Sequence, residues 1–128
     1  MTFEDAVPII EGKLYAWAVW RREYPDASIS SVYDAEEGRS ETRNTTSPQE
    51  RWVLRHALEL RDASVIERTI QRMSEDQRRL IWMRYVERRH LRVIAHMLHV
   101  SLPQVYRIRD QALSLLAYEF GLLSGDVA

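Results

Sequence analysis

The chain has 128 residues, 45% hydrophobic and 29% charged, which suffices for one compact domain around a single core. It contains no cysteine, which excludes disulfides, thiolate catalysis and cysteine-ligated zinc. The net charge of -1 excludes a uniformly basic, histone-like protein. The apolar runs are too short for a membrane span and the acidic start lacks a basic n-region, so we expect a cytoplasmic protein that contacts no membrane.

The charge is distributed unevenly along the chain. Residues 1–50 carry 5 basic and 10 acidic groups, residues 51–109 carry 13 and 6, and residues 110–128 carry 0 and 3, so the net charges are -5, +7 and -3. Of the 18 cations 17 are arginine, the side chain suited to forked contacts with phosphate and guanine. This asymmetry indicates that the third quarter of the chain faces a polyanion.

The N-terminal part predicts an amphipathic helix over residues 8–24, ended by Tyr24-Pro25 because proline disfavours helical backbone in the residue before it. It belongs to an N-terminal helical segment over residues 1–33. A polar stretch without large apolar residues follows and predicts an exposed linker over residues 34–47. The apolar face of the helix consists of Ile9, Ile10, Leu14, Ala16, Trp17 and Trp20.

A long helix over residues 48–73 is predicted next. Ser47-Pro48-Gln49-Glu50 supplies an N-cap hydroxyl, a proline at the first helical position and a glutamate that closes a capping box. At 1.5 Å per residue the helix is roughly 39 Å long. Its apolar stripe needs a partner surface along its whole length and consists of Val53, Ala57, Leu60, Ala63, Ile66, Ile70 and Met73.

The capping-box pattern recurs at Ser74–Gln77 and predicts a helix that ends near Val86. A polar break over residues 87–90 and a short helix over residues 91–98 follow. A third box at Ser101–Gln104 opens a final helix over residues 102–118. The residues expected to face inward are Leu80, Ile81, Tyr85, Ile94, Ala95, Leu98, Val105, Ile108, Ala112, Leu115 and Leu116.

No segment alternates with a period of two, so we predict an all-α protein. The long helix and the helices after it form the unit 48–121, and residues 122–128 form a tail. The last two helices meet through His99-Val100-Ser101, which is the arrangement of a helix-turn-helix. A helix held in this way enters a DNA major groove with its first turns leading. Residues 88–109 contain five arginines and no acid, the charge pattern that DNA binding requires.

The stretch MRYVERRHLRVIAHMLHVSLPQVYRIRDQALSLL resembles region 4 of bacterial sigma factors, whose pattern runs Leu-Arg-Tyr, a turn, Ile-Ala-x-x-Leu, Ser-x-x-x-Val and Ala-Leu-x-x-Leu. A closer resemblance over residues 47–121, from SPQERWVLRHALEL through LLAYEFG, is to the RinA/ArpU-type phage transcriptional regulators. Those proteins are small DNA-binding activators of phage late or packaging genes. The resemblance implies a sigma region 4-like helix-turn-helix and a phage or prophage regulator.

Carried over residue by residue, the resemblance implies base contacts from Leu102, Pro103, Tyr106 and Arg107. Arg107 suits a bidentate contact with guanine, because Val105 and Ile108 point the other way. The side chains expected to contact DNA phosphates are Arg88, Arg89, Arg92, Gln104 and Arg109.

Two kinds of departure from the family pattern stand out. His99 and Arg88 occupy positions where the family usually has glycine, at turns whose backbone tends toward positive φ. Leu102 and Pro103 replace a polar pair that is common in sigma factors, so base readout depends more heavily on Arg107.

Other chemistry finds little support in the sequence. His90, His96 and His99 invite a metal site, but no cysteine completes a set, so we expect no metal and no cofactor. Nucleophile elbows, phosphate-cradling glycine loops and paired acids are missing, so we expect no enzyme. Trp17 and Trp20 are predicted to be core residues. For Trp82 two placements stay open: burial in the core, or a position that covers the N-terminal helices or a second subunit.

The expected function is sequence-specific transcription regulation on double-stranded DNA, with a contact to RNA polymerase through the N-terminal part. One alternative is a sigma-like factor or a small terminase-like packaging subunit, although residues 1–47 are too short and acidic for a sigma region 2. Another is a protein-interaction adaptor that has lost DNA binding. A homodimer through helices 8–24 and 48–73 is a further expectation, and intramolecular packing of the same faces is its alternative.

Overall fold

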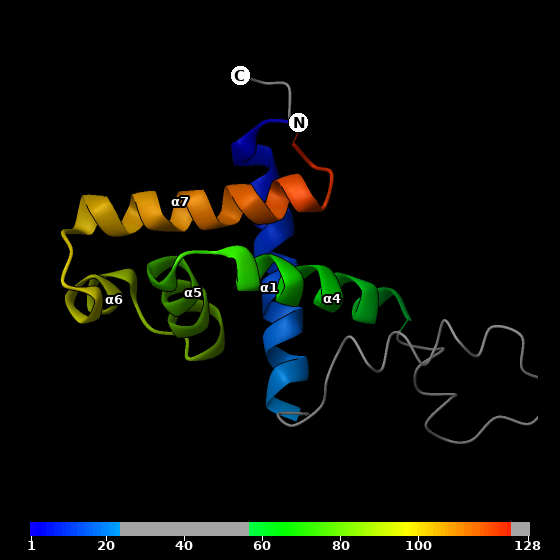
Figure 1. Cartoon of the computed structure of the whole chain (residues 1–128), viewed down its shortest axis with the longest axis horizontal. Helices are drawn as coiled ribbons and strands as arrows, with labels where there is room; N and C mark the ends of the chain where they lie inside the picture. The colour runs from blue at the N-terminus through cyan, green and yellow to red at the C-terminus, as the bar shows by residue number, and fades with distance from the viewer. Residues whose placement is uncertain (24–56, 124–128) are drawn as a thin grey trace, which may run out of the picture.

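The computed structural model describes residues 1–23 and 57–123, and within these ranges every regular element is helical, so the all-α class is confirmed. Figure 1 shows α6 and the start of α7 at one end of the molecule and α4 toward the other. None of the described helices is both long and apolar enough to cross a membrane. The elements are α1 (Phe3–Glu23), α4 (Ala57–Arg72), α5 (Glu75–Ile81), η1 (Trp82–Val86), α6 (Leu91–Leu98) and α7 (Leu102–Glu119).

Helix α1 begins at Phe3, five residues before the predicted start. The Thr2 hydroxyl accepts a hydrogen bond from the Asp5 N–H at 3.2 Å and so caps the helix. Pro8 lies inside the helix, where it leaves the carbonyl of Glu4 without its usual partner. Both residues are exposed, so water can bind that carbonyl and the helix tolerates the proline.

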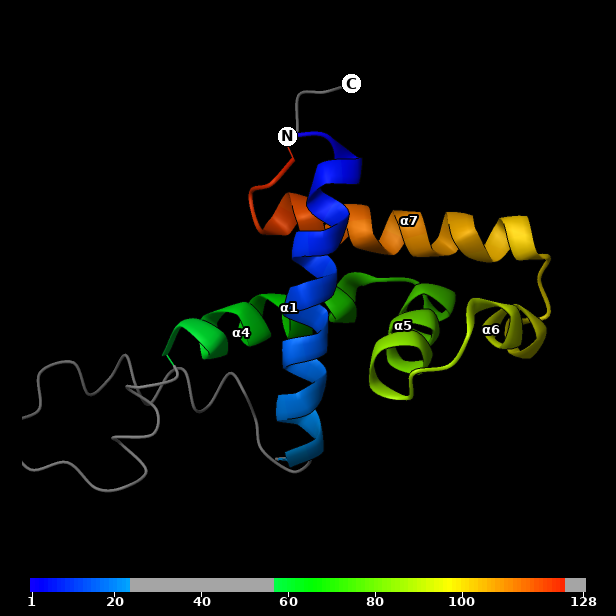
Figure 2. The ribbon, with the colours of Figure 1, turned by 180° about the vertical axis from the view of Figure 1, so that it is seen from behind.

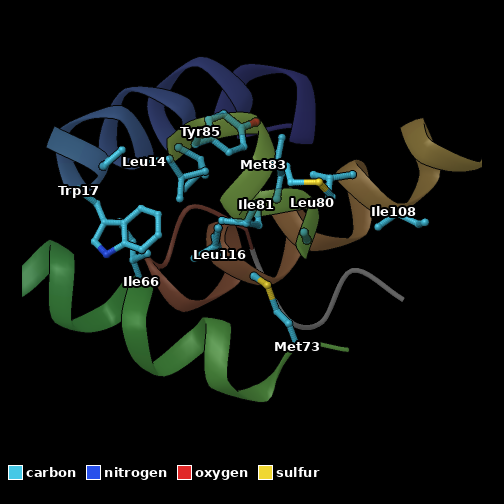
Figure 3. Close-up of a cluster of buried hydrophobic side chains, with 14 of the residues drawn as sticks. Leu14, Trp17, Ile66, Met73, Leu80, Ile81, Met83, Tyr85, Ile108 and Leu116 are labelled. Atoms are coloured by element: carbon cyan, nitrogen blue, oxygen red, sulfur yellow. The ribbon is translucent and has the colours of Figure 1, made fainter. Parts of the chain in front are cut away.

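A single hydrophobic core joins α1 to the C-terminal helices. Figure 2 shows α1 lying across α4 and α7, and Figure 3 shows Leu14 and Tyr85 pointing into the space between them. Trp17 and Trp20 are buried in this core, as predicted. In the long-helix stripe, Leu60, Ala63, Ile66 and Met73 are buried in it as well, and Ile70 packs against it half-buried. The predicted linker 34–47, the helix start at Ser47 and Trp52 lie outside the described residues.

The capping box before α5 is confirmed, because Ser74 and Gln77 exchange both hydrogen bonds, at 3.2 and 3.0 Å. The helix then widens into a π-helical turn, η1, in which the N–H of Glu87 reaches the carbonyl of Trp82 at 3.1 Å. The sequence analysis did not predict this turn, because one residue inserted into a helix hardly changes the spacing of its apolar residues. Trp82 stays 45% exposed and meets Trp17 edge-on, with ring centroids 6.2 Å apart.

Helices α6 and α7 match the predicted ranges to within one residue. One inward position was wrong, because Leu115 is 43% exposed whereas Leu113 is fully buried. The buried arc of α7 is turned toward Leu113 because α1 and α5 both pack against α7. Leu115 lies beyond the opposite edge of that arc.

Candidate nucleic-acid interface

The turn between α6 and α7 has a defined backbone geometry. His99 adopts the left-handed conformation, with φ 59°, as expected for a position where the resembling family has glycine. Its N–H donates to the carbonyl of His96 at 3.2 Å, and the N–H of Val100 donates to the carbonyl of Ala95 at 3.0 Å. These are the two hydrogen bonds of a Schellman motif, which ends α6 and fixes the direction of the chain into α7.

The start of α7 is fixed by Ser101 and by the core. The Ser101 hydroxyl accepts from the N–H of Gln104 at 3.2 Å, so the hydroxyl half of the predicted third box forms. Ala95 on α6 and Val105 on α7 are buried at the corner, and Val100 packs against the core between the two helices. Their packing holds α7 at its angle to α6 and leaves the other side of its first turns exposed.

Most of the residues expected to read bases share that exposed side. Pro103, Tyr106 and Arg107 are all exposed, and Tyr106 is 46% accessible. Arg107 stands between buried Val105 and Ile108, so its side chain faces outward as the spacing predicts. Leu102 is half-buried and packs against the core.

The arginines of the acid-free stretch have different environments. Arg92 on α6 and Arg107 on α7 are exposed, and neither guanidinium pairs with any residue in the described ranges. Arg88 lies 5.8 Å from the ring centroid of Tyr15, and Arg89 forms a 2.7 Å ion pair with Glu87. Both remain exposed, and Arg88 has a positive φ of 56°, as the comparison with a family glycine indicates. The unpaired charge is therefore concentrated on Arg92 and Arg107.

Arg109 departs from the phosphate-binding role expected of it. Its side chain is only 21% exposed and turns toward α1, where its Nη2 lies 3.6 Å from Oε2 of Glu11. Its Nη1 lies 3.3 Å from Oδ1 of Asp110. With two carboxylates beside it, Arg109 is placed to anchor α7 to α1, and we do not assign it a contact with DNA.

The same carboxylate of Glu11 accepts a hydrogen bond from the hydroxyl of Tyr85 at 2.8 Å. Tyr85 is fully buried, and burial together with the neighbouring Glu11 carboxylate raises the pKa of its phenol well above the ordinary value. Glu11, Tyr85 and Arg109 thus connect α1, η1 and α7 through one polar cluster. Its members are far apart in sequence, and no local pattern marks them.

A groove beside the start of α6 contains Arg84, a cation that the sequence analysis did not include among the candidate DNA contacts. Arg84 is half-buried, its Nη1 donates to the carbonyl of Arg89 at 3.1 Å, and its Nε has no partner among the described residues. The first N–H groups of α6 receive no side-chain cap from His90. Arg84 precedes the acid-free window, so a charge count beginning at residue 88 passes over it. The groove is lined by Arg84, His90, Leu91, Arg92, Val93, Leu102 and Tyr106.

His90, His96 and His99, which the sequence analysis considered as metal ligands, do not form a metal-binding cluster. No group of three or more His, Cys, Asp or Glu side chains suited to a metal ion occurs within residues 1–23 and 57–123.

Comparisons with protein-family models, with curated proteins and with solved structures found no match to this chain.

Proposed function

We propose that the chain is a sequence-specific regulator of transcription that binds double-stranded DNA, of the RinA/ArpU phage type that its sequence resembles. In this proposal α6 and α7 form a helix-turn-helix, and the first turns of α7 enter the major groove. The observation that carries the proposal is the pair of exposed arginines, Arg92 and Arg107, which have no described partner and lie on the two helices of the turn.

The exposed side chains have different roles in this proposal. Arg107 makes a bidentate contact with a guanine, and Tyr106 contacts a thymine methyl or a phosphate next to it. Arg92, Arg84 and the uncapped N-terminus of α6 bind one phosphate in the groove described above, because helix N–H groups and guanidinium both attract an anion. Arg88, Arg89 and Gln104 are exposed and contribute further phosphate contacts. Phosphate contacts set the register in which Arg107 meets its base.

The test is a fluorescence anisotropy titration of labelled duplexes from phage or prophage upstream regions, with random duplexes as reference, at two salt concentrations. Binding should weaken steeply with salt because phosphate contacts release counterions. Arg107→Ala should cost about 1–3 kcal/mol on the specific duplex and much less on random DNA. Arg92→Ala should weaken both to a similar degree. The matched control is Arg68→Ala, an exposed arginine on α4, which should change neither.

Two outcomes would contradict the proposal. Salt-independent binding, or none to any phage duplex, would leave the protein-interaction adaptor as the better description. Equal losses on specific and random DNA for Arg107→Ala would make Arg107 a phosphate contact and remove it from base readout.

A further inference from the structure

A hollow between α1, α4 and the end of α5 has a tryptophan at its rim. Its volume is about 310 Å³. Trp82 is 45% exposed there, although tryptophan is on average among the well-covered side chains of folded proteins. The π-helical turn η1 begins at this residue, and π-helical turns are frequent at functional sites. The hollow is lined by Trp17, Arg21, Glu67, Ile70, Arg78, Ile81 and Trp82.

The hollow has a surplus of positive charge. The acid among its lining residues, Glu67, is already paired, because its Oε1 lies 2.5 Å from Nη2 of Arg21 and accepts a hydrogen bond from Nε1 of Trp17 at 3.3 Å. Arg78 lines the hollow and Arg79 follows it on α5. Both are exposed, and neither guanidinium pairs with a residue in the described ranges. A group that fills this hollow is therefore favoured if it is apolar and has a negative charge beside it.

The position of Trp82 in this hollow is fixed on one side and open on the other. One edge of its ring meets Trp17, which reaches from α1 toward α4 in Figure 3. The acids of α5, Glu75 and Asp76, are in the first turn, roughly 10 Å from Trp82 along the helix axis. The surroundings of the open side of the ring are therefore set by Arg78 and Arg79 and not by those acids.

The hollow is separate from the groove that we assign to DNA. None of its lining residues also lines the groove beside α6, which contains Arg84 and Arg92. In Figures 1 and 2, α5 stands between α1 on one side and α6 on the other, and the hollow is on the α1 side. Duplex phosphates can pair with an arginine, but they present no apolar group to cover the ring of Trp82. DNA therefore fits this hollow poorly.

The shape of the hollow favours a protein partner over a small molecule. Its rim residues Trp82 and Arg78 are exposed, so the hollow is open, whereas a pocket for a small molecule encloses most of its ligand. Tryptophan and arginine are enriched at the centres of protein interfaces, where they pair with an anchoring side chain of the partner. We propose that this hollow is the docking site of a protein segment that presents an apolar side chain flanked by aspartate or glutamate.

Docking at this hollow leaves the helix-turn-helix free. The apolar side chain of the partner packs on Trp82 and Ile70, and its carboxylate pairs with Arg78. None of these contacts involves α6 or α7. Docking itself does not depend on DNA binding, but if the proposed function holds, a chain bound to DNA through α6 and α7 can hold a second protein at the same time.

The test is a titration of the isotope-labelled full chain with synthetic peptides, followed by two-dimensional NMR. The probe peptide has a central Phe-Leu pair with aspartate and glutamate on both sides. One reference peptide replaces the acids with lysine, and the other replaces the apolar pair with Gly-Ser. The probe peptide should shift the backbone N–H signals of Arg78 and Trp82, and it should bind about 10-fold more tightly than either reference.

Two substitutions, each with a matched control, locate the site. Trp82→Ala should weaken binding of the probe peptide about 10-fold, because it removes an apolar wall of the hollow. Arg78→Glu should weaken it to a similar degree and strengthen binding of the lysine peptide, an exchange of preference that misfolding does not produce. The controls are Tyr118→Ala, an exposed ring on α7, and Arg68→Glu, an exposed charge on α4, and neither should change peptide binding.

Absence of peptide binding, or equal affinity for the three peptides, would overturn the inference, as would a preference that survives both Trp82→Ala and Arg78→Glu. The DNA titration is a separate readout, in which Trp82→Ala should bind both kinds of duplex as the wild type does. Weaker DNA binding by Trp82→Ala without any peptide preference would assign the hollow to the DNA interface and overturn the docking site. Preferential peptide binding by a wild type that binds no DNA would retain the docking site and reject the proposed function.

Discussion

Replacing Tyr85 with phenylalanine measures how firmly α1 is joined to the C-terminal helices. The substitution keeps the buried ring and its edge contact with Tyr15, 5.3 Å between centroids, and removes only the hydroxyl that donates to Glu11 at 2.8 Å. A hydrogen bond to a charged group contributes about 1.5–3 kcal/mol. Because Arg109 still faces the Glu11 carboxylate, we expect a loss near the lower end, about 1.5–2 kcal/mol in the free energy of unfolding.

Glu11→Ala should cost more, about 2–3 kcal/mol, because it leaves the buried phenol without an acceptor and leaves the Arg109 guanidinium with Asp110 alone. The double variant should lose less than the sum of the single losses, by roughly 1 kcal/mol, since all three side chains belong to one cluster. Urea unfolding followed by far-UV circular dichroism gives these values.

A cost below about 0.5 kcal/mol for Tyr85→Phe would refute this reasoning, since that is the size of an ordinary surface substitution. If the losses from Tyr85→Phe and Glu11→Ala were strictly additive in the double variant, that would refute the reasoning as well. Either result would show that α1 is held by apolar packing alone and that Glu11 does not anchor Tyr85.

Further predictions concern the turn, the cap and pH. His99→Gly should raise the free energy of unfolding by about 0.5–1 kcal/mol, because glycine adopts the positive φ of this position without strain, and a measured loss would contradict that account. Ser74→Ala should lower the free energy of unfolding by about 0.5–2 kcal/mol through loss of the capping box, and exposed Gln71→Ala is the control in the same assay. The raised pKa of Tyr85 stabilises the fold below the ordinary tyrosine pKa of about 10, and this contribution is lost as the pH rises through the higher folded value. Above pH of about 10 the wild type should therefore lose stability faster than Tyr85→Phe, and parallel pH curves would exclude the effect.

Local signals account for the parts of the fold that the sequence predicted. The serine at Ser74 followed by Gln77 specifies a helix start within four residues, and the short helix α6 carries its apolar residues at regular spacing. The positive φ of His99 followed from the glycine that the resembling family has at this position of the turn. In each of these the interacting groups are close neighbours in the chain, so the pattern contains the whole interaction.

The missed features depend on partners distant in the chain. Leu115 fits the apolar spacing of α7 and is nevertheless exposed, because the position of α1 decides which side of α7 is covered. Arg109 belongs to a basic stretch and is nevertheless paired, because Glu11 comes to it from α1. Of the expected DNA contacts, the exposure of Arg107 followed from the spacing of Val105 and Ile108, whereas Arg84 was found only from the groove in the structure.

The two sides of α7 have separate roles, because one side packs in the core and the other is exposed. Val105, Ile108 and Ala112 hold the helix in the core, while Pro103 and Arg107 contribute little to that packing. Exchanging the outward set should therefore leave the architecture intact while altering which DNA sequence is preferred. If the proposed function holds, this chain is a scaffold on which recognition can diverge, or be redesigned, independently of folding.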